Sequence, residues 1–421
     1  MSEIKELIER LCPDGVEYKK LGEVIISLKT GLNPRKNFVL NEPGSNRPYI
    51  TGKDIFNNRI NVSDKTDLIT DDALKLINKR ACLENGLLLF ASTGTGTVGR
   101  MAIIENYKND WAMSETLYAI KTKEQLLPKF LMYYLYSENS RNQFEPKISK
   151  GSVPHLKVSD LQNVLLPVPP IEVQRKIVEI LDNFTELEAE LEAELEARRK
   201  QYEYFRNQLL TFDDTRSDVK WMTLGEIGTF TRGNGLQKAD FVDMGFPCIH
   251  YGQIYTRYGL STNKTITYCT EELAKKLVKA KTGDMIIACT SENIEDVCKS
   301  VVWLGEGEVA TGGHSCVFSH NQVPKYVAYY FQTVHFFNQK KKYAKGVKVI
   351  DIKAVDMEKI LIPIPPLEEQ KRIVAILDRF EALTTDLQSG LPVEIEARRK
   401  QYEYYREKLL TFKRKTAEWQ K

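Results

Sequence analysis

The hydrophobic and polar positions of this chain follow two kinds of pattern, and each kind occurs twice. In two stretches apolar residues recur every three or four positions, which is the spacing of one face of a long helix. In two others, short apolar runs are separated by glycine and polar turns, which predicts β-strands. The predicted organisation is, in order, a short N-terminal helix (1–14), a first β-rich domain (15–167), a first long helix (168–212), a second β-rich domain (213–363), a second long helix (364–412) and a tail (413–421).

The two long helices are copies of one another. Ile177 and Phe184 recur 196 residues further on, whereas Arg198 recurs 200 residues further on. The second copy therefore carries four extra residues, about one helical turn. The sequence Ser-Gly-Leu-Pro at 389–392 is expected to interrupt the second helix at this point, because glycine is unfavourable inside a helix and proline suits the first turn of a new one. Because repeats within one chain usually meet about a pseudo-two-fold axis, we expect the helices to lie antiparallel.

Each helix carries an apolar stripe with roughly coiled-coil spacing. Taken alone, either stripe is an ordinary core-facing surface, but the two can also bury one another. The residues expected in this coiled coil are Ile177, Leu181, Phe184, Leu187, Leu191, Leu195, Ile373, Leu377, Phe380, Leu383, Leu387 and Ile395.

Residues 186–197 are three tandem copies of Glu-Leu-Glu-Ala. Each copy adds about 6 Å of helical rise and nearly preserves the apolar face, so the repeat is suited to adjusting length. An ordinary solvated helix of good helix formers is the simpler interpretation.

The two β-rich domains share a framework. Both open on Leu-Gly-Glu, contain a buried-strand run after a glycine, continue into a tyrosine-rich helix and close on an apolar strand ending in prolines. The residues between these shared positions differ widely. The predicted fold class is α+β, with two β-rich α/β domains separated by two long antiparallel helices in a pseudo-two-fold internal repeat.

Charge and cysteine content narrow the functional classes. The net charge is +3, but the helical repeats are acidic on balance, so the excess of positive charge lies in the β-rich domains and favours a polyanionic partner. The seven cysteines form no CxxC pair, which predicts buried, reduced thiols. No apolar run is long enough for a membrane span, and the N-terminal stripe lacks a signal-peptide core, so we expect a cytoplasmic protein.

Catalytic and cofactor motifs are weak or missing. Gly94, Gly96 and Gly99 satisfy GxGxxG, but a strand rather than a helix is expected to follow, so a tight hairpin loop is favoured over a dinucleotide site. There is no P-loop, and the five histidines have no metal-ligand spacing. The sequence therefore predicts a non-catalytic chain with no metal site.

Basic and polar clusters occur near glycine-containing loops of both β-rich domains. A charge run is usually a solvated surface, but its recurrence in both domains makes phosphate and groove contacts an equal alternative. The predicted DNA-contacting residues are Arg35, Lys36, Thr95, Arg100, Lys147, Lys150, Ser152, Arg232, Asn234, Lys238, Lys341, Lys342, Lys345 and Lys348.

The repeated motifs resemble those of the specificity subunit of Type I restriction–modification systems over essentially the whole chain. The resemblance rests on three elements that each occur twice: Pro-x-Pro-Pro followed by Gln-x-x-Ile-Val-x-Ile-Leu-Asp-x-Phe, Arg-Arg-Lys-Gln-Tyr-Glu-Tyr closing with Leu-Leu-Thr-Phe, and the opening Leu-Gly-Glu. The Glu-Leu-Glu-Ala copies lie where the family varies a tetrad repeat, with acidic residues at more positions.

This resemblance implies a double-stranded DNA reader that is not itself an enzyme. Two target-recognition domains would each read half of a bipartite asymmetric site and direct adenine methylation and restriction, and the coiled coil would set the half-site spacing. Two methyltransferase subunits and two motor-endonuclease subunits would be the partners. S-adenosylmethionine, ATP and magnesium would belong to those partners, with no cofactor in this chain.

Two other classes stay open from the residues alone. A structural coiled-coil adaptor would bridge two proteins without DNA, and its binding would be insensitive to salt and DNA sequence. An enzyme built on the glycine loop would bind nucleotide as the isolated chain.

Overall fold

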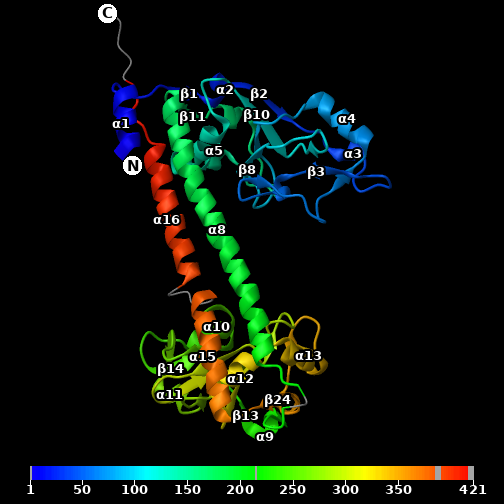
Figure 1. Cartoon of the computed structure of the whole chain (residues 1–421), viewed down its shortest axis with the longest axis vertical. Helices are drawn as coiled ribbons and strands as arrows, with labels where there is room; N and C mark the ends of the chain where they lie inside the picture. Colours follow the sequence, from blue (N-terminus) through cyan, green and yellow to red (C-terminus); the bar gives the residue numbers. More distant parts are fainter. Residues whose placement is uncertain (1, 214–215, 385–389, 416–421) are drawn as a thin grey trace, which may run out of the picture. The chain divides into compact units, whose positions relative to one another are not determined.

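The computed structural model describes residues 2–213, 216–384 and 390–415 (Figure 1). The chain forms two compact units. Unit 1 comprises residues 1–189 and 397–421, and unit 2 comprises residues 190–396. Each unit therefore contains one β-rich domain together with a segment of each long helical region.

The elements of the β-rich domain of unit 1, with the N-terminal helix, are α1 (Ser2–Leu11), β1 (Tyr18–Lys20), α2 (Leu21–Val24), β2 (Ile25–Thr30), α3 (Pro34–Asn37), β3 (Arg47–Ile50), β4 (Ile55–Phe56), β5 (Arg59–Ile60), β6 (Leu68–Ile69), α4 (Asp71–Arg80), β7 (Leu88–Ala91), β8 (Met101–Ile103), β9 (Ala112–Met113), β10 (Leu117–Thr122), α5 (Pro128–Tyr136), α6 (Glu138–Phe144), α7 (Val158–Gln162) and β11 (Leu165–Pro167).

The elements of the β-rich domain of unit 2 are β12 (Lys220–Thr223), α9 (Leu224–Ile227), β13 (Gly228–Arg232), β14 (Phe246–Ile249), α10 (Tyr251–Thr256), β15 (Ser261–Thr262), β16 (Thr267–Cys269), α11 (Glu271–Ala274), β17 (Val278–Ala280), β18 (Met285–Ala288), β19 (Thr290–Ser291), β20 (Ser300–Trp303), β21 (Val309–Thr311), β22 (Ser315–His320), α12 (Pro324–Tyr330), α13 (Val334–Tyr343), β23 (Ile350–Asp351), α14 (Ala354–Met357) and β24 (Leu361–Ile364). The long helices are α8 (Ile171–Leu209), α15 (Leu367–Thr384) and α16 (Leu391–Leu409).

The main sheets of the two units have the same core topology. Unit 1 has four strands in the order β2-β10-β7-β8, and unit 2 has five in the order β13-β22-β18-β20-β15. The strands β7 and β18 are buried along their whole length, which is why their sequences are continuously apolar rather than alternating. A smaller sheet accompanies each, β6-β3-β9 in unit 1 and β16-β14-β21-β17 in unit 2. The predicted α+β fold class is confirmed.

The long helices pack antiparallel inside unit 1. Phe184 of α8 stacks on Tyr405 of α16 with ring centroids 5.5 Å apart, and Glu188 accepts a hydrogen bond from Arg399 at 2.6 Å. Later residues of α8 therefore meet earlier residues of α16. Unit 2 makes the equivalent contact between α8 and α15, where Phe205 stacks on Phe380 at 5.4 Å. This internal repetition confirms the duplicated architecture.

Most of the predicted coiled-coil residues are at least partly covered. The buried ones are Ile177, Leu181, Ile373, Leu377 and Ile395, and the half-buried ones are Phe184, Leu187, Leu191, Leu195 and Phe380. Leu383 was expected on the same stripe but is 51 % exposed, because it lies in the last turn of α15. Leu387 lies outside the described residues. The predicted interruption is present at Gly390, which has φ +81° and directly precedes the start of α16 at Leu391, whereas Ser389 lies outside the described residues.

A repeated polar contact fixes each β-rich domain to its long helix. In unit 1, Asp182 of α8 accepts hydrogen bonds from Lys129 at 3.0 Å and from the Tyr133 hydroxyl at 2.6 Å. Burial, followed by the hydrogen bond to Asp182, raises the pKa of Tyr133, so its hydroxyl stays a donor. In unit 2, Asp378 accepts from Lys325 and Tyr329 at the same two distances.

The glutamine of the repeated motif makes a second fixed contact. Gln174 is fully buried, accepts a hydrogen bond from the Leu127 amide at 2.8 Å and donates to the Pro169 carbonyl. Gln370 accepts from the Val323 amide at 3.0 Å in unit 2. A buried amide with all its partners in place orients the helix precisely against the domain, because an unpaired polar group there would be costly.

Unit 1 contains residues from the N-terminal and the C-terminal parts of the sequence. The α1 stripe packs on its core through Ile4, and Glu3 lies 3.2 Å from Lys176 of α8. Val16 pairs with Arg414 in a parallel bridge, and Leu410 belongs to the same core. Residues 410–415, which follow α16, are therefore structural parts of unit 1.

Two further findings bear on the sequence-based expectations. All the cysteines are free, and all but Cys82 are buried; Cys82 is exposed, contrary to the prediction. Its position in the turn after α4, with its side chain next to the Leu83 carbonyl, leaves the thiol at the surface. Among the helices that the structure describes, none is both long and apolar enough to cross a membrane.

Candidate nucleic-acid interface

One edge of the main sheet in unit 1 gathers several of the predicted DNA-contacting loops. The strands β2 and β7 end at this edge and β10 begins there, because Thr30 pairs with Tyr118 and Ala91 pairs with Leu117. The loops 31–37, 92–100 and 114–116 therefore leave the sheet side by side. We call these loops, together with 149–155, the loop edge of unit 1.

The basic loop 149–155 joins this edge through backbone pairing. The Gly94 amide donates to the Pro154 carbonyl at 3.0 Å, and the Thr93 hydroxyl is 2.8 Å from Nδ1 of His155. The exposed residues Thr95, Lys150 and Ser152 lie on these two adjacent loops. Residues more than 50 positions apart in the sequence are thus brought to one surface.

The glycine loop of this edge does not open a helix. It forms a series of turns that lead directly into β8 at Met101, as expected from the sequence. Gly94, with φ +120°, could not be replaced freely, since a Cβ there would lie 2.4 Å from the Thr97 hydroxyl. The amides are therefore not arranged at a helix N-terminus, as pyrophosphate binding in a dinucleotide fold requires.

Unit 2 repeats this loop edge with different side chains. The strands β13 and β18 end where β22 begins, because Arg232 pairs with Cys316 and Ala288 pairs with Ser315. The loops 233–237, 289–299 and 312–314 leave the sheet there, and β23 pairs with β19 to place the loop 345–351 beside them. We call this set, together with Arg232 at the end of β13, the loop edge of unit 2, and its exposed cations are Arg232, Lys345 and Lys348.

The other predicted contact residues differ in their exposure and in the polar contacts that their side chains make. Asn234 is exposed, but its amide donates to the Lys276 carbonyl at 2.9 Å and accepts from the Val278 amide at 3.0 Å, which favours a structural role. Arg100 is half-buried and donates to the Ile55 carbonyl at 3.3 Å, and Lys147 is 4.0 Å from Asp160. The residues Arg35, Lys238, Lys341 and Lys342 are exposed, and the side chain of Lys36 lies outside the described part of the chain.

Lys340 is a supporting residue that was not singled out within the lysine run at 340–342. It is 4 % exposed, and its ammonium donates to the carbonyls of Glu295 at 3.0 Å and Val297 at 2.6 Å. Burial lowers the pKa of Lys340. Its helical spacing of four from the buried Phe336 is the signal that identifies it. Lys340 thereby holds the loop 289–299 of the loop edge against α13.

Lys340→Met is expected to lower the free energy of unfolding by about 2 kcal/mol, because two carbonyls lose a charged donor. Denaturant unfolding of the full chain measures this change. Lys341→Met is the matched control, since Lys341 is the exposed neighbour and its substitution should change stability by less than about 0.5 kcal/mol. Equal stabilities of the two variants would contradict the role assigned to Lys340.

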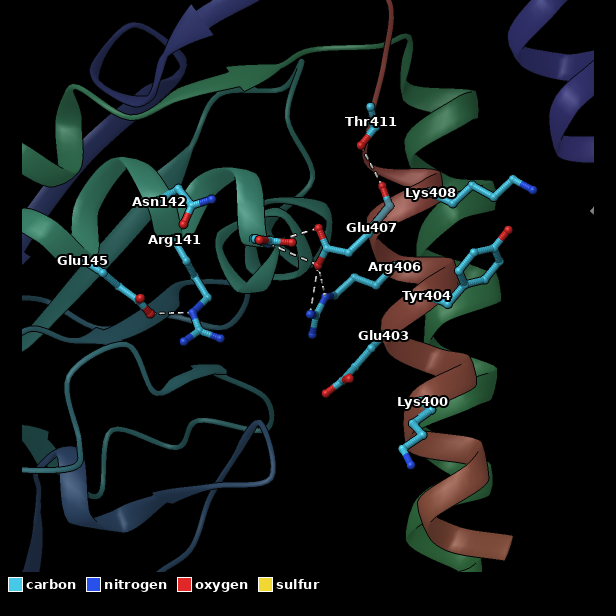
Figure 2. Close-up of a pocket in the computed structure, with 11 residues that line it drawn as sticks. Arg141, Asn142, Glu145, Lys400, Glu403, Tyr404, Arg406, Glu407, Lys408 and Thr411 are labelled. Atoms are coloured by element: carbon cyan, nitrogen blue, oxygen red, sulfur yellow. Dashed lines mark hydrogen bonds and ion pairs between the residues drawn. The ribbon is translucent and has the colours of Figure 1, made fainter.

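A second surface lies in unit 1 between α6 and α16, where a groove of about 1100 Å³ opens (Figure 2). The Glu407 carboxylate accepts a hydrogen bond from the Glu138 amide at 3.0 Å and so caps the first turn of α6. Arg406 donates to the same carboxylate at 2.9 Å. Figure 2 shows Lys400 and Glu403 further along α16, on the same groove.

The exposed residues of this helix face occur identically in unit 2. Lys400, Glu403 and Tyr404 correspond to Lys200, Glu203 and Tyr204 of α8, and both tyrosines are 60 % exposed. We call these six residues the repeated face. The same three exposed side chains are therefore present on the helical segment of each unit.

Nothing in the described residues forms a metal centre, since no group of three or more His, Cys, Asp and Glu side chains is placed to hold an ion.

The similarity to known proteins is divided between the two halves of the chain in the same way. The family model for the Type I restriction modification DNA specificity domain matches the chain twice, over residues 13–197 and 216–397. Each match covers one β-rich domain and most of the helical segment that follows it.

Curated relatives cover most of the chain. A putative type I restriction enzyme specificity subunit of Haemophilus influenzae is 30% identical over 415 residues, covering 94% of this chain and 96% of the relative. A type I restriction enzyme specificity subunit of Escherichia coli is 33% identical over 302 residues, covering 68% of this chain and 71% of the relative.

Solved structures share the fold. One chain, from a study of complex assembly and conformational transition in the type I R-M system, matches with a TM-score of 0.59 at 19% identity and covers 95% of this chain and 98% of that one. The S subunit of a Type-I restriction-modification system from M. genitalium matches with a TM-score of 0.52 at 16% identity and covers 94% and 96% of the two chains.

Proposed function

The chain belongs to the Type I restriction–modification DNA specificity family, and we propose that it reads a bipartite, asymmetric site in double-stranded DNA. Each loop edge contacts one half-site, and the long helices set the interval between the half-sites. The chain supplies recognition, while cytoplasmic partner subunits carry out adenine methylation and restriction.

The observation that carries this proposal is the pair of loop edges. Both are built at the same edge of the same kind of sheet, yet exposed side chains on them differ, as Thr95 and Ser152 of unit 1 differ from Arg232 and Lys348 of unit 2. Lysine and arginine neutralise phosphates, and hydroxyl groups and arginine can bond to base edges. Two unlike surfaces on one repeated framework are suited to an asymmetric site.

The repeated face supports the assembly part of the proposal. Two identical exposed surfaces fit two copies of one partner, and we assign them to the two methyltransferase subunits. Two motor-endonuclease subunits complete the restricting complex. S-adenosylmethionine, ATP and magnesium act in those partners and not in this chain.

The direct test of DNA reading is methylome sequencing of cells with and without the gene for this chain. A bipartite adenine-methylated motif should be present only when the gene is present. A methylome that is unchanged by deletion of the gene would refute the proposal. Binding of the assembled complex should also weaken steeply with salt, which separates DNA reading from a purely structural adaptor.

Tyr404→Ala is expected to weaken binding of one methyltransferase subunit by about thirtyfold, and Tyr204→Ala should weaken the other, because exposed tyrosines are common interface anchors. The double variant should bind neither copy tightly. Mass measurements of the complex report the stoichiometry. Lys371→Ala is the control, since Lys371 is an exposed residue of α15 that is replaced by Arg175 in the other copy and lies outside the repeated face. Unchanged two-to-one assembly of the double variant would contradict the assignment.

A further inference from the structure

The loops 149–155 and 345–351 end in tips of the same construction. In unit 1 the Ser149 amide donates to the His155 carbonyl at 3.0 Å, which leaves the five residues 150–154 as the tip. In unit 2, Lys345 and Asp351 exchange backbone hydrogen bonds of 3.1 Å and 2.8 Å, which leaves residues 346–350 as the tip. The two tips lie at matching positions, 196 residues apart in the sequence.

Each tip is anchored firmly at its base. In unit 1 the buried Leu156 donates its amide to the Ser92 carbonyl at 2.9 Å. In unit 2 the buried Ile352 donates its amide to the Cys289 carbonyl at 3.0 Å. Gly346, at φ +118°, shapes the second tip, because a Cβ there would lie 2.0 Å from the Val349 carbonyl oxygen. The two ends of each tip are therefore fixed to the unit that carries it.

Both tips expose valine side chains next to lysine. Val153 of unit 1 and its counterpart Val349 of unit 2 are 56 % and 58 % exposed, and Val347 is 96 % exposed. Lys150 lies on the first tip and Lys348 on the second, both exposed. Single exposed apolar residues need no explanation, but here they recur at one position of both loop edges, and unit 2 places a second valine beside Lys348.

We propose that these tips enter a groove of the DNA and that their valines make apolar contacts with thymine methyl groups, while the adjacent lysines contact phosphates. Valine can form no hydrogen bond with phosphate or with a base edge, whereas the C5-methyl of thymine in the major groove is an apolar target. This inference rests on the DNA-reading function proposed above and names one of its specificity determinants. Anchored tips are suited to it because little ordering is required on binding.

The test uses the full chain assembled with its methyltransferase subunits and duplexes carrying the mapped site. Val347→Ala should lower affinity by up to about tenfold, because two methyl groups leave the contact. Replacing each thymine of the half-site by deoxyuridine removes only the base methyl. The thymines are replaced one at a time. At the position whose methyl contacts Val347, the replacement should weaken DNA binding by the wild-type complex by a similar factor. The same replacement should not weaken DNA binding by the Val347→Ala complex any further.

A lysine variant and two further valine variants serve as controls. Lys348→Gln should lower the magnitude of the salt slope by about one while leaving base preference unchanged, whereas Val347→Ala should leave the slope unchanged. Val355→Ala removes the same methyl groups from an exposed valine on α14, and it should change neither the affinity for the site nor the salt slope. Val153→Ala should alter the response to deoxyuridine in the opposite half-site only.

The possible failures are distinguishable. If wild-type complex shows no sequence preference, the proposed function itself fails. The methyl contact is refuted if the wild-type complex is selective but Val347→Ala binds the site as tightly as Val355→Ala does. It is also refuted if the affinity lost through Val347→Ala adds in full to the affinity lost through deoxyuridine at every position. Loss of methyltransferase binding by Val347→Ala with unchanged base preference would instead assign the tip to a protein interface and overturn the inference.

Discussion

Deletion of Glu190–Ala193 is expected to abolish methylation of the original site and to create methylation of a site whose spacer is shorter by one or two base pairs. The deletion removes one Glu-Leu-Glu-Ala copy from the middle of α8, a helix of 39 residues. Four helical residues correspond to about 6 Å of rise, and one base pair of B-DNA to about 3.4 Å. The apolar spacing is nearly preserved, so the two half-site sequences should stay the same.

Methylome sequencing of a strain carrying the deletion measures this result. The control is the double substitution Glu190→Ala and Glu192→Ala, which changes the same tetrad without changing its length and should leave the spacer unaltered. Altered half-site sequences in the deletion strain would mean that the helix shapes the loop edges rather than their interval.

Exchange of residues 15–165 for those of a relative is expected to replace one half-site completely and leave the other unchanged. Specific binding of DNA exceeds non-specific binding by a factor on the order of 10³ or more, so the original motif should become undetectable in the methylome. The half-site read by unit 2 is the internal control. Changes in both half-sites would contradict independent reading by the two units.

The structure adds a condition for success of this exchange. Lys129 and Tyr133 lie inside the exchanged segment, but their partner Asp182 lies outside it. A donor with a lysine and a tyrosine at these positions should give a stable chimera. A donor lacking both should leave the Asp182 carboxylate without these two donors, and the chimera should unfold at lower denaturant concentration.

The repeat made much of the architecture predictable. The spacing of Ile177, Leu181 and Phe184 indicated a long helix, and Gly390 with Pro392 indicated the interruption before α16. These features are local, so propensity and periodicity are sufficient to find them. Leu383 shows the limit, because it continues the apolar spacing in the sequence but lies one residue before the end of α15 and is exposed.

The arrangement of the loop edges could not be obtained in the same way. The order of strands in the sheets places Thr93 beside His155 and Thr290 beside Asp351. Short sequence patterns do not specify this order. Asn234 and Lys340 illustrate the same point for single residues. Asn234 was predicted to contact DNA, but its side chain hydrogen-bonds to the backbone. Lys340 lies in a lysine run that the sequence suggests is solvated, but it is buried.

Because unit 1 combines residues before 190 with residues after 396, its folding depends on the order of synthesis on the ribosome. Unit 2 is one continuous segment and can close its core once residue 396 has emerged, whereas unit 1 must wait for Leu409, Leu410 and Phe412. The N-terminal half of the polypeptide is therefore the last to mature. Chains released after residue 396 should contain a finished second half and an open, protease-sensitive first half.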